Sequence, residues 1–220
     1  SYTNNNHWNR TTFDTSKSTI NVKTLLNKGV LAGVAGGLLG WLIVEQMMDT
    51  SWEIFLITIL SAVISFVLAA WEEFYVGARS KVVHTGFKRL LIGLGTGFFG
   101  GIIAGGIFNG LTDNLYITDQ PSDWIVEMTL YRAIVWTILG AAIGLSQGLF
   151  PVEKIRLKNG LIGGAIGGFL GGLPFDYLTV ITNDDVLSRA VGFTLIGLFI
   201  GLGISLVEQI SKQAWLQVVR

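Results

Sequence analysis

The chain has 220 residues, of which 50% are hydrophobic and only 14% are charged, and its mean hydropathy is +0.57. A soluble domain carries about a quarter charged residues because its surface must face water, so this composition indicates a membrane protein. The 15 basic and 15 acidic residues cancel, which leaves no net positive charge for nucleic acid. Because there is no cysteine, disulfides, thiolate nucleophiles and cysteine-based metal sites are excluded.

Six stretches are apolar enough to cross the hydrocarbon core of a membrane, which takes roughly 20 residues of helix. Helices are expected because a segment in lipid must satisfy its own backbone hydrogen bonds, and no stretch alternates with the period of two of a barrel strand. In chain order the predicted spans are Gly29–Met48, Ile54–Trp71, Leu90–Leu111, Met128–Phe150, Leu161–Thr179 and Ala190–Val207.

The basic residues indicate the orientation of these spans. If both termini are cytoplasmic, thirteen of the 15 basic residues lie inside, and only Arg132 and Arg189 lie outside, where the connections are acidic. This distribution follows the positive-inside rule. We therefore expect a cytoplasmic segment over 1–28, containing a basic amphipathic interfacial helix, then a six-helix membrane domain over 29–210 and a cytoplasmic tail over 211–220. The expected location is a bacterial inner membrane or an internal photosynthetic membrane.

The spans repeat in pairs. The odd spans align without gaps on their glycines, and the even spans align on a threonine followed by small residues at four-residue spacing. The aligned segments are 33–40, 93–100 and 164–171 in the odd spans, and 58–65, 137–144 and 194–201 in the even spans. The unit is a hairpin of two spans, present three times, at about 29–71, 90–150 and 161–207. Each hairpin crosses twice, so all three share one orientation, which predicts an all-α, pseudo-threefold bundle.

Glycine at every fourth position lets helix backbones approach each other, which matters in lipid because helix association there depends on close packing. We expect these glycines to pack the bundle as a glycine zipper, with contact to another subunit or to lipid as the alternative. The predicted packing positions are Gly33, Gly36, Gly37, Gly40, Gly93, Gly97, Gly100, Gly140, Gly144, Gly164, Gly167, Gly168, Gly171, Gly197 and Gly201.

No residues indicate catalysis, a cofactor or a metal. The segment 95–100 fits the G-x-G-x-x-G dinucleotide pattern, but it lies inside an apolar span and follows no predicted strand. The two histidines, His7 and His84, have no second ligand at metal spacing. We therefore predict that the protein is not an enzyme.

Four charged residues lie at the outer ends of the spans. Glu45 and Asp176 occupy equivalent places in repeats one and three, and Arg132 and Arg189 share a place in repeats two and three. Ionisable groups this close to hydrocarbon face the bundle and pair. We expect Asp176 to pair with an arginine, with Arg189 of the same hairpin as the first candidate. We favour a structural role for this pair, as a clamp between helices, over a role as a transport site.

The last third of the chain carries a resemblance. Residues 214–220 alternate like the opening of a strand, which predicts a β-domain after the last span. The glycine-rich run Lys158–Asp176, the sequence Leu187–Ala190 and the exit Val207–Arg220 resemble bacterial membrane proteins in which a glycine-rich multispan region precedes a cytoplasmic forkhead-associated (FHA) domain. The resemblance implies the anchor of a phosphorylation-linked signalling or assembly protein, with the phosphothreonine-reading residues after Arg220.

These features favour a non-enzymatic membrane anchor or scaffold that contacts lipids and other membrane or cytoplasmic subunits, binds no nucleic acid, and could form an oligomer. The alternative is a small-solute transporter or channel, because three parallel two-span repeats also describe the mitochondrial carrier plan. Against it, the Pro-x-acid-x-x-basic signature of that plan is missing, and Pro174-Phe-Asp176 is the nearest approach to it.

Overall fold

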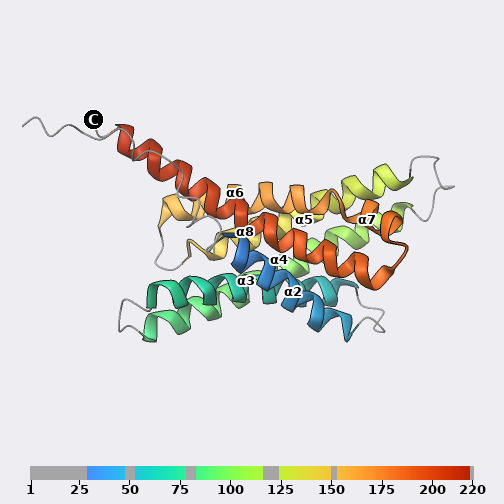
Figure 1. The fold of residues 1–220 in the computed structure, drawn as a ribbon, viewed down its shortest axis with the longest axis horizontal. Coiled ribbons are helices and arrows are strands. Elements are labelled where there is room, and N and C mark those ends of the chain that lie inside the picture. The colour runs from blue at the N-terminus through green and yellow to red at the C-terminus, as the bar shows by residue number, and fades with distance from the viewer. Residues whose placement is uncertain (1–28, 48–52, 78–82, 116–123, 150–152, 219–220) are drawn as a thin grey trace, which may run out of the picture.

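A computed structural model describes residues 29–47, 53–77, 83–115, 124–149 and 153–218 (Figure 1). Within these ranges every secondary-structure element is a helix, which confirms the all-helical prediction. The interfacial helix expected within residues 1–28 lies outside the described residues. The helices are α2 (Leu31–Glu45), α3 (Glu53–Gly77), α4 (Val83–Leu115), α5 (Trp124–Ser146), α6 (Lys154–Gly172), α7 (Phe175–Thr182) and α8 (Asp185–Val218).

Four of these helices contain a segment long and apolar enough to cross a membrane: Ile54–Phe74, Phe87–Leu111, Val126–Ser146 and Asp185–Ser211. The other two predicted spans fall short for different reasons. Helix α2 is apolar but has only 15 residues. Helix α6 has 19 residues, but it begins with three basic side chains within five residues and is rich in glycine, which lowers its hydropathy.

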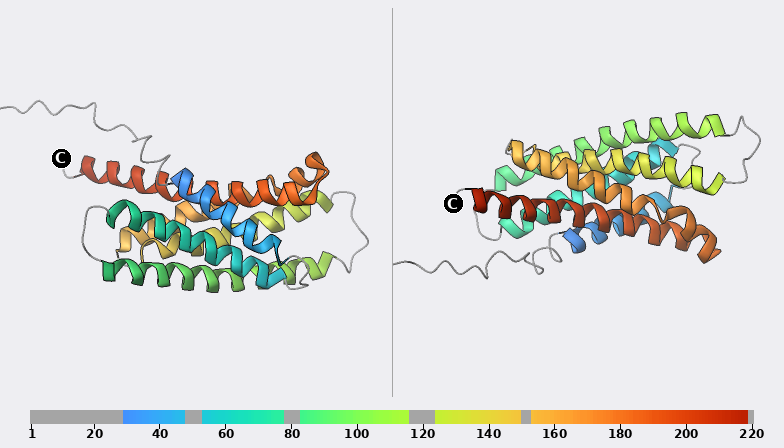
Figure 2. Two further views of the ribbon diagram at one scale, coloured as in Figure 1. Left: turned by 60° about the horizontal axis from the view of Figure 1, so that its bottom comes forward. Right: turned by 90° about the horizontal axis from the view of Figure 1, so that it is seen from above.

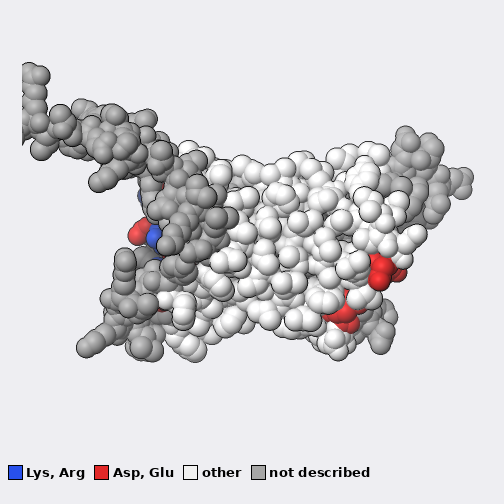
Figure 3. Space-filling model, in the orientation of Figure 1, with Lys and Arg blue, Asp and Glu red and all other residues white. Residues whose placement is uncertain are grey.

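The six longer helices form a closed ring. Each packs against the next in the order α2, α3, α4, α5, α6 and α8, and α8 returns to pack against α2 (Figures 1 and 2). We call the end that holds Gly29, Gly77 and Lys154 the proximal end, and the end that holds Glu45, Leu115 and Thr182 the distal end. On the face shown in Figure 3, the charged side chains of the described residues lie at these two ends and the surface between them is uncharged.

The centre of the ring is filled by aliphatic side chains from three helices. In α3, α5 and α8, two positions one turn apart are at most 1% exposed to solvent. These positions are equivalent in the alignment of the even spans. They are Leu60, Leu139 and Ile196, followed by Ile64, Ile143 and Ile200.

Three equivalent threonines lie beside this core. The hydroxyl groups of Thr58, Thr137 and Thr194 each donate a hydrogen bond of 2.6 Å to the carbonyl four residues earlier in their own helix. Thr96 makes the same contact with the carbonyl of Ile92 at 2.8 Å. These hydroxyl groups satisfy their own helices, so they do not combine into a polar lining.

All fifteen glycines predicted to pack the helices are buried. Two hairpins use them in the same way. A Cβ atom added to Gly36 would lie 3.3 Å from the Cα of Ile64, and one added to the equivalent Gly167 would lie 2.6 Å from the Cα of Ile200. These distances leave little or no room for a side chain, so glycine sets how closely the two helices of each hairpin approach.

Contacts between hairpins also rely on glycine. Gly33 of α2 meets the backbone of Gly197 in α8, and the equivalent Gly164 of α6 meets Gly140 in α5. Helix α4 departs from this register, because Gly93 meets Ser65 of α3, one turn further along. The hairpin that starts with α4 is therefore offset by one helical turn from the arrangement of the other two.

The predicted fifth span, Leu161–Thr179, is interrupted. Helix α6 ends at Gly172 and the short α7 begins at Phe175, directly after Pro174. Proline has no N–H to donate and its ring clashes with the preceding turn, so a helix cannot pass through it undisturbed. Helix α7 then ends at Asn183, whose φ of 52° lies in the left-handed region that asparagine tolerates.

The predicted strand at the end of the chain is wrong. Helix α8 continues to Val218, so residues 214–218 are helical. At its other end, the Asp184 side chain accepts hydrogen bonds from the backbone N–H groups of Val186 and Leu187, at 2.9 and 3.1 Å, which caps the helix.

Candidate polar cavity at the proximal end

A small cavity opens at the proximal end between α3, α5, α6 and α8. Its volume is about 60 Å³, which is enough for a few water molecules. Leu68, Gln147 and Ile204, which line it, are equivalent positions of the three even spans. The cavity therefore lies where the three hairpins converge, above the aliphatic core.

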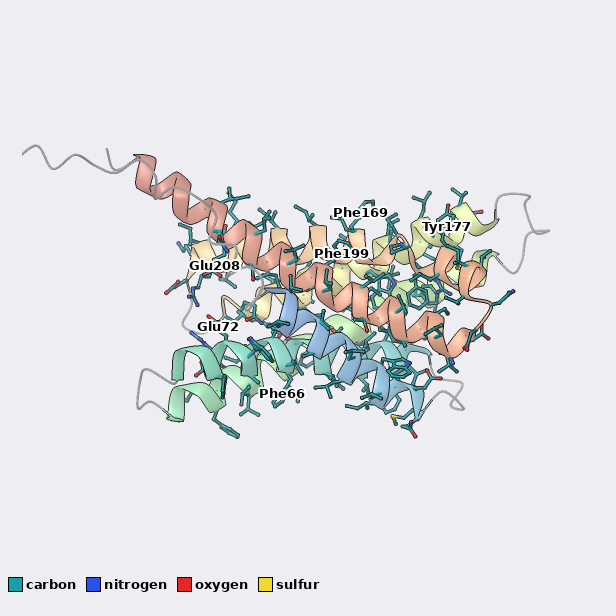
Figure 4. All side chains as sticks on the ribbon, viewed as in Figure 1. Phe66, Glu72, Phe169, Tyr177, Phe199 and Glu208 are labelled. Carbon is teal, nitrogen blue, oxygen red and sulfur yellow. The ribbon has the colours of Figure 1, made fainter. Side chains whose placement is uncertain are left out.

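Charged side chains of three helices surround the cavity. Arg156 of α6 lies with its Nη1 atom 3.1 Å from Oε1 of Glu72 in α3, and with its Nη2 atom 3.9 Å from Oε1 of Glu208 in α8. Glu72 and Glu208 are equivalent positions of two repeats, and both lie toward the proximal end in Figure 4. Arg156 thus connects the two helices of the third hairpin to α3 of the first.

Further ion pairs surround Arg156. Its Nε atom lies 3.2 Å from Oε2 of Glu153. On the other side of Glu72, Arg89 of α4 contacts Glu73 at 2.9 Å and Glu72 at 3.6 Å. The network joins α3, α4, α6 and α8 at one level of the bundle.

The electrostatic balance keeps Arg156 charged. Burial of the guanidinium disfavours its charge, but attraction to Glu72, Glu208 and Glu153 outweighs burial and raises the pKa of Arg156 above its ordinary value. A permanent cation therefore stands at the mouth of the cavity.

Uncharged polar groups complete the lining. Asn159 accepts a hydrogen bond of 2.9 Å from the Ser211 hydroxyl, which ties α6 to α8. Gln147 donates to the Ser146 hydroxyl at 3.0 Å, and Ser65 of α3 donates to the same oxygen at 3.1 Å. The Ser146 hydroxyl in turn donates to the carbonyl of Ile143 at 2.6 Å. Two of the cavity's lining residues, Gln147 and Asn159, are therefore held by hydrogen bonds to serines behind them.

Chemically, this arrangement can hold water or a small polar solute and can cross-link helices. It pairs an arginine with carboxylates, and its described lining contains no histidine or cysteine. Among the described residues, no three histidine, aspartate or glutamate side chains converge as a metal site.

At the distal end, the structure joins two of the four predicted polar residues. Arg189 of α8 forms a two-pronged ion pair with Glu45 of α2, with Nη2 to Oε1 at 2.7 Å and Nε to Oε2 at 3.0 Å. Arg189 was expected to pair within its own hairpin with Asp176, whose side chain lies outside the described residues. The observed pair instead connects the first and last helices of the ring.

The other predicted arginine lies among aromatic rings. The guanidinium carbon of Arg132 is 5.0 Å from the ring centre of Phe175 and 5.8 Å from that of Phe108. Phe175 in turn packs against Trp136 and Phe193, with ring centres 6.3 and 5.4 Å apart. The pseudo-equivalent arginines therefore use different partners, an aromatic group for Arg132 and a carboxylate for Arg189.

Replacement of Arg156 tests whether the proximal network stabilises the fold. Arg156→Gln removes the cation between Glu72 and Glu208, and we expect the free energy of unfolding in detergent to fall by about 1 kcal/mol, since these groups are partly exposed. Arg156→Lys retains the charge but cannot reach several carboxylates at once, so its loss should be smaller. Equal stability of all three proteins would contradict a structural role.

The charged residues of this cavity are not among the predicted site residues, whose charges all lie at the outer ends of the spans. One signal was present: Glu72 and Glu208 both follow the aligned threonine by the same interval, Thr58 to Glu72 and Thr194 to Glu208. Arg156 carries no such signal, because only the packing of the helices brings its side chain between Glu72 and Glu208.

No protein-family model matches this sequence. No curated protein and no solved structure is significantly similar to it. The fold and its apolar surface therefore define the class without a relative: an all-helical protein with four helices suited to crossing a membrane.

Proposed function

We propose that the protein is a non-enzymatic integral membrane scaffold. In this proposal six helices cross the membrane as three glycine-packed hairpins around a pseudo-threefold axis, and both termini are cytoplasmic. The location is a bacterial inner membrane or an internal photosynthetic membrane. The cytoplasmic ends tether partner subunits or an FHA-like domain, as the sequence resemblance suggests.

One observation carries the proposal: the centre of the ring is closed. Leu60, Leu139 and Ile196 meet there with at most 1% of their surfaces exposed, and the neighbouring threonine hydroxyls bond to their own helices. The proximal cavity ends above this aliphatic layer. A solute path needs polar lining or broken helices at mid-membrane, so the closed centre favours a scaffold over a carrier.

The repeat arrangement has its own support. Gly36 and Gly167 face Ile64 and Ile200, so the matching contacts fall at equivalent positions of two hairpins. The lengths of α2 and α6 are also compatible with crossing. At 1.5 Å per residue, the 19 residues of α6 are about 28 Å long, and the part after Lys158 covers about 21 Å, so this helix would depend on thinning of the bilayer or on neighbouring helices. Helix α2 covers about 22 Å, so its ends would depend on thinning of the bilayer or on neighbouring helices.

The topology can be tested cleanly because the chain has no native cysteine. Asp185→Cys places a thiol at the distal end and Glu153→Cys places one at the proximal end, and both positions are exposed. We expect a membrane-impermeant maleimide applied to intact spheroplasts to label the first variant, and to label the second only after permeabilisation. Labelling of both from one side would show that α6 and α7 do not carry the chain across.

The scaffold role is tested by the state of the purified protein. Mild extraction from its native membrane followed by native mass measurement should give an oligomer or a stoichiometric complex. A monomer without a partner, extracted under conditions that preserve other membrane complexes, would count against the role.

The transporter alternative has one observation in its favour, the cavity around Arg156. It predicts solute flux in reconstituted vesicles that is lost in Arg156→Gln, and in Asp176→Asn if the distal acidic residue takes part. We expect no flux above that of protein-free vesicles. Flux that depends on either residue would replace the scaffold proposal.

A further inference from the structure

The basic side chains of the proximal end fall into two groups. The guanidinium groups of Arg89 and Arg156 turn into the bundle and pair with carboxylates at 2.9 and 3.1 Å. Lys154 and Lys158, in contrast, are exposed, and no described carboxylate lies within ion-pair distance of either. The two lysines therefore keep charge that no described carboxylate neutralises.

These two lysines share one face of α6. They lie four residues apart, one turn along the helix, so their side chains project from the same side. Below them the same face continues with Leu161, Ile162 and Phe169, which are 39%, 37% and 41% exposed. Figure 4 shows Phe169 at the outer edge of the bundle. The buried glycines lie on the opposite side of α6, and among the described residues no helix packs on this face.

The start of α6 adds to the positive potential. Glu153 precedes the helix and its side chain makes no capping hydrogen bond, while its carboxylate contacts Arg156. The first turn contains no acidic residue. The N-terminal end of a helix carries a partial positive charge, so Lys154, in the first turn, lies where a cation is unfavourable unless an anion is present, and Lys158 lies one turn further along.

We propose that this face of α6 binds an anionic phospholipid. The headgroup phosphate lies between Lys154 and Lys158, and an acyl chain follows Leu161, Ile162 and Phe169 toward the distal end. Charge complementarity selects the lipid, since the surface is cationic at one end and apolar along its length. The inference rests on the proposed function, because it requires α6 to lie against the bilayer with its lysines at the headgroup level.

The test is a lipid titration of the full-length protein in detergent, read by native mass spectrometry. Phosphatidylglycerol should bind at low micelle fraction and phosphatidylcholine should not. Each lysine near an anionic headgroup contributes about fivefold in affinity, so the Lys154→Gln/Lys158→Gln variant should bind phosphatidylglycerol roughly thirtyfold more weakly. The Lys154→Arg/Lys158→Arg variant should retain binding.

The matched control is Lys88→Gln, which removes an exposed lysine at the same end but on α4. It should change the affinity by less than about twofold if α6 holds the site. Equal loss in this control, unchanged binding in the double glutamine variant, or no preference for phosphatidylglycerol would each overturn the proposal. Protein in a detergent micelle has no inner or outer side, so the lipid titration does not depend on the topology that maleimide labelling tests. The proposal of a lipid site and the proposed topology can therefore be refuted separately.

Discussion

Gly97→Ala is expected to lower the free energy of unfolding by about 1–3 kcal/mol, the usual cost of forcing a methyl group into a full interface. A Cβ atom on Gly97 would lie 2.8 Å from the Cα of Ala62 in α3, and backbone atoms cannot rotate away as side chains can. The two helices must therefore separate along their whole contact. Thermal or denaturant unfolding in detergent, followed by circular dichroism, would measure the loss.

Gly95→Ala is the matched control. It makes the same chemical change two residues away in the same helix, but no atom lies within 4 Å of the added Cβ. We expect its stability to equal or slightly exceed that of the wild type, because alanine restricts the unfolded chain more than glycine does. Adding Gly101→Ala, which would bring a Cβ 2.5 Å from the Cα of Thr58, should deepen the loss seen with Gly97→Ala. Similar stability of the Gly95 and Gly97 variants would refute close packing of α4 on α3.

The ion pair between Glu45 and Arg189 should be worth about 2 kcal/mol to stability, between the values of surface and buried pairs. The two side chains are only 17% and 23% exposed, and their two hydrogen bonds are of charge-assisted length. Glu45→Gln or Arg189→Gln leaves one charge without its partner in a poorly hydrated place. Each single variant should therefore unfold more readily.

The exchange Glu45→Arg/Arg189→Glu separates pairing from independent effects. If the two residues stabilise each other, the double exchange should recover part of the stability that each single change removes. Asp185→Asn serves as the control, since it removes an exposed charge next to Arg189 and should shift stability by less than about 0.5 kcal/mol. An exchange as damaging as the sum of its single changes would argue against the pair.

No core residue was predicted from the sequence, but the structure places equivalent positions of the repeat alignment in the interior of the bundle. Aligning the even spans on Thr58, Thr137 and Thr194 places residues of one type at equivalent positions, and those positions hold the fully buried side chains. Glycines at four-residue spacing are likewise buried. Such patterns are readable because each helix repeats its contacts every turn, independent of distant parts of the chain.

Predictions that rested on apolar composition alone were less accurate. The predicted span Leu161–Thr179 runs through Pro174, which has no backbone N–H to donate. The structure divides this segment into α6 and α7. The prediction of a strand from Ala214 onward did not take into account that these residues directly continue α8. Extending an existing helix by a few residues needs no new nucleus, whereas an isolated strand has no partner for its hydrogen bonds.

The partner of Arg189 could not be predicted from local sequence. The expected partner, Asp176, lies in the same hairpin, but closing the ring brings α2 beside α8, and Glu45 lies 144 residues away in the chain. The proximal cavity was missed for the same reason, since Arg156 of the third hairpin meets Glu72 of the first only in the assembled bundle. Interactions between repeats depend on the closed ring, which no single segment encodes.

Ring closure has a consequence for the order of assembly during synthesis. Helices α3 and α4, or α5 and α6, are consecutive in the chain and can associate as soon as the later one enters the membrane. Gly33 of α2, in contrast, meets Gly197 of α8, which is synthesised 164 residues later. Until α8 enters the membrane, this flank of α2 lacks its partner helix, so an insertion factor or lipid must shield it.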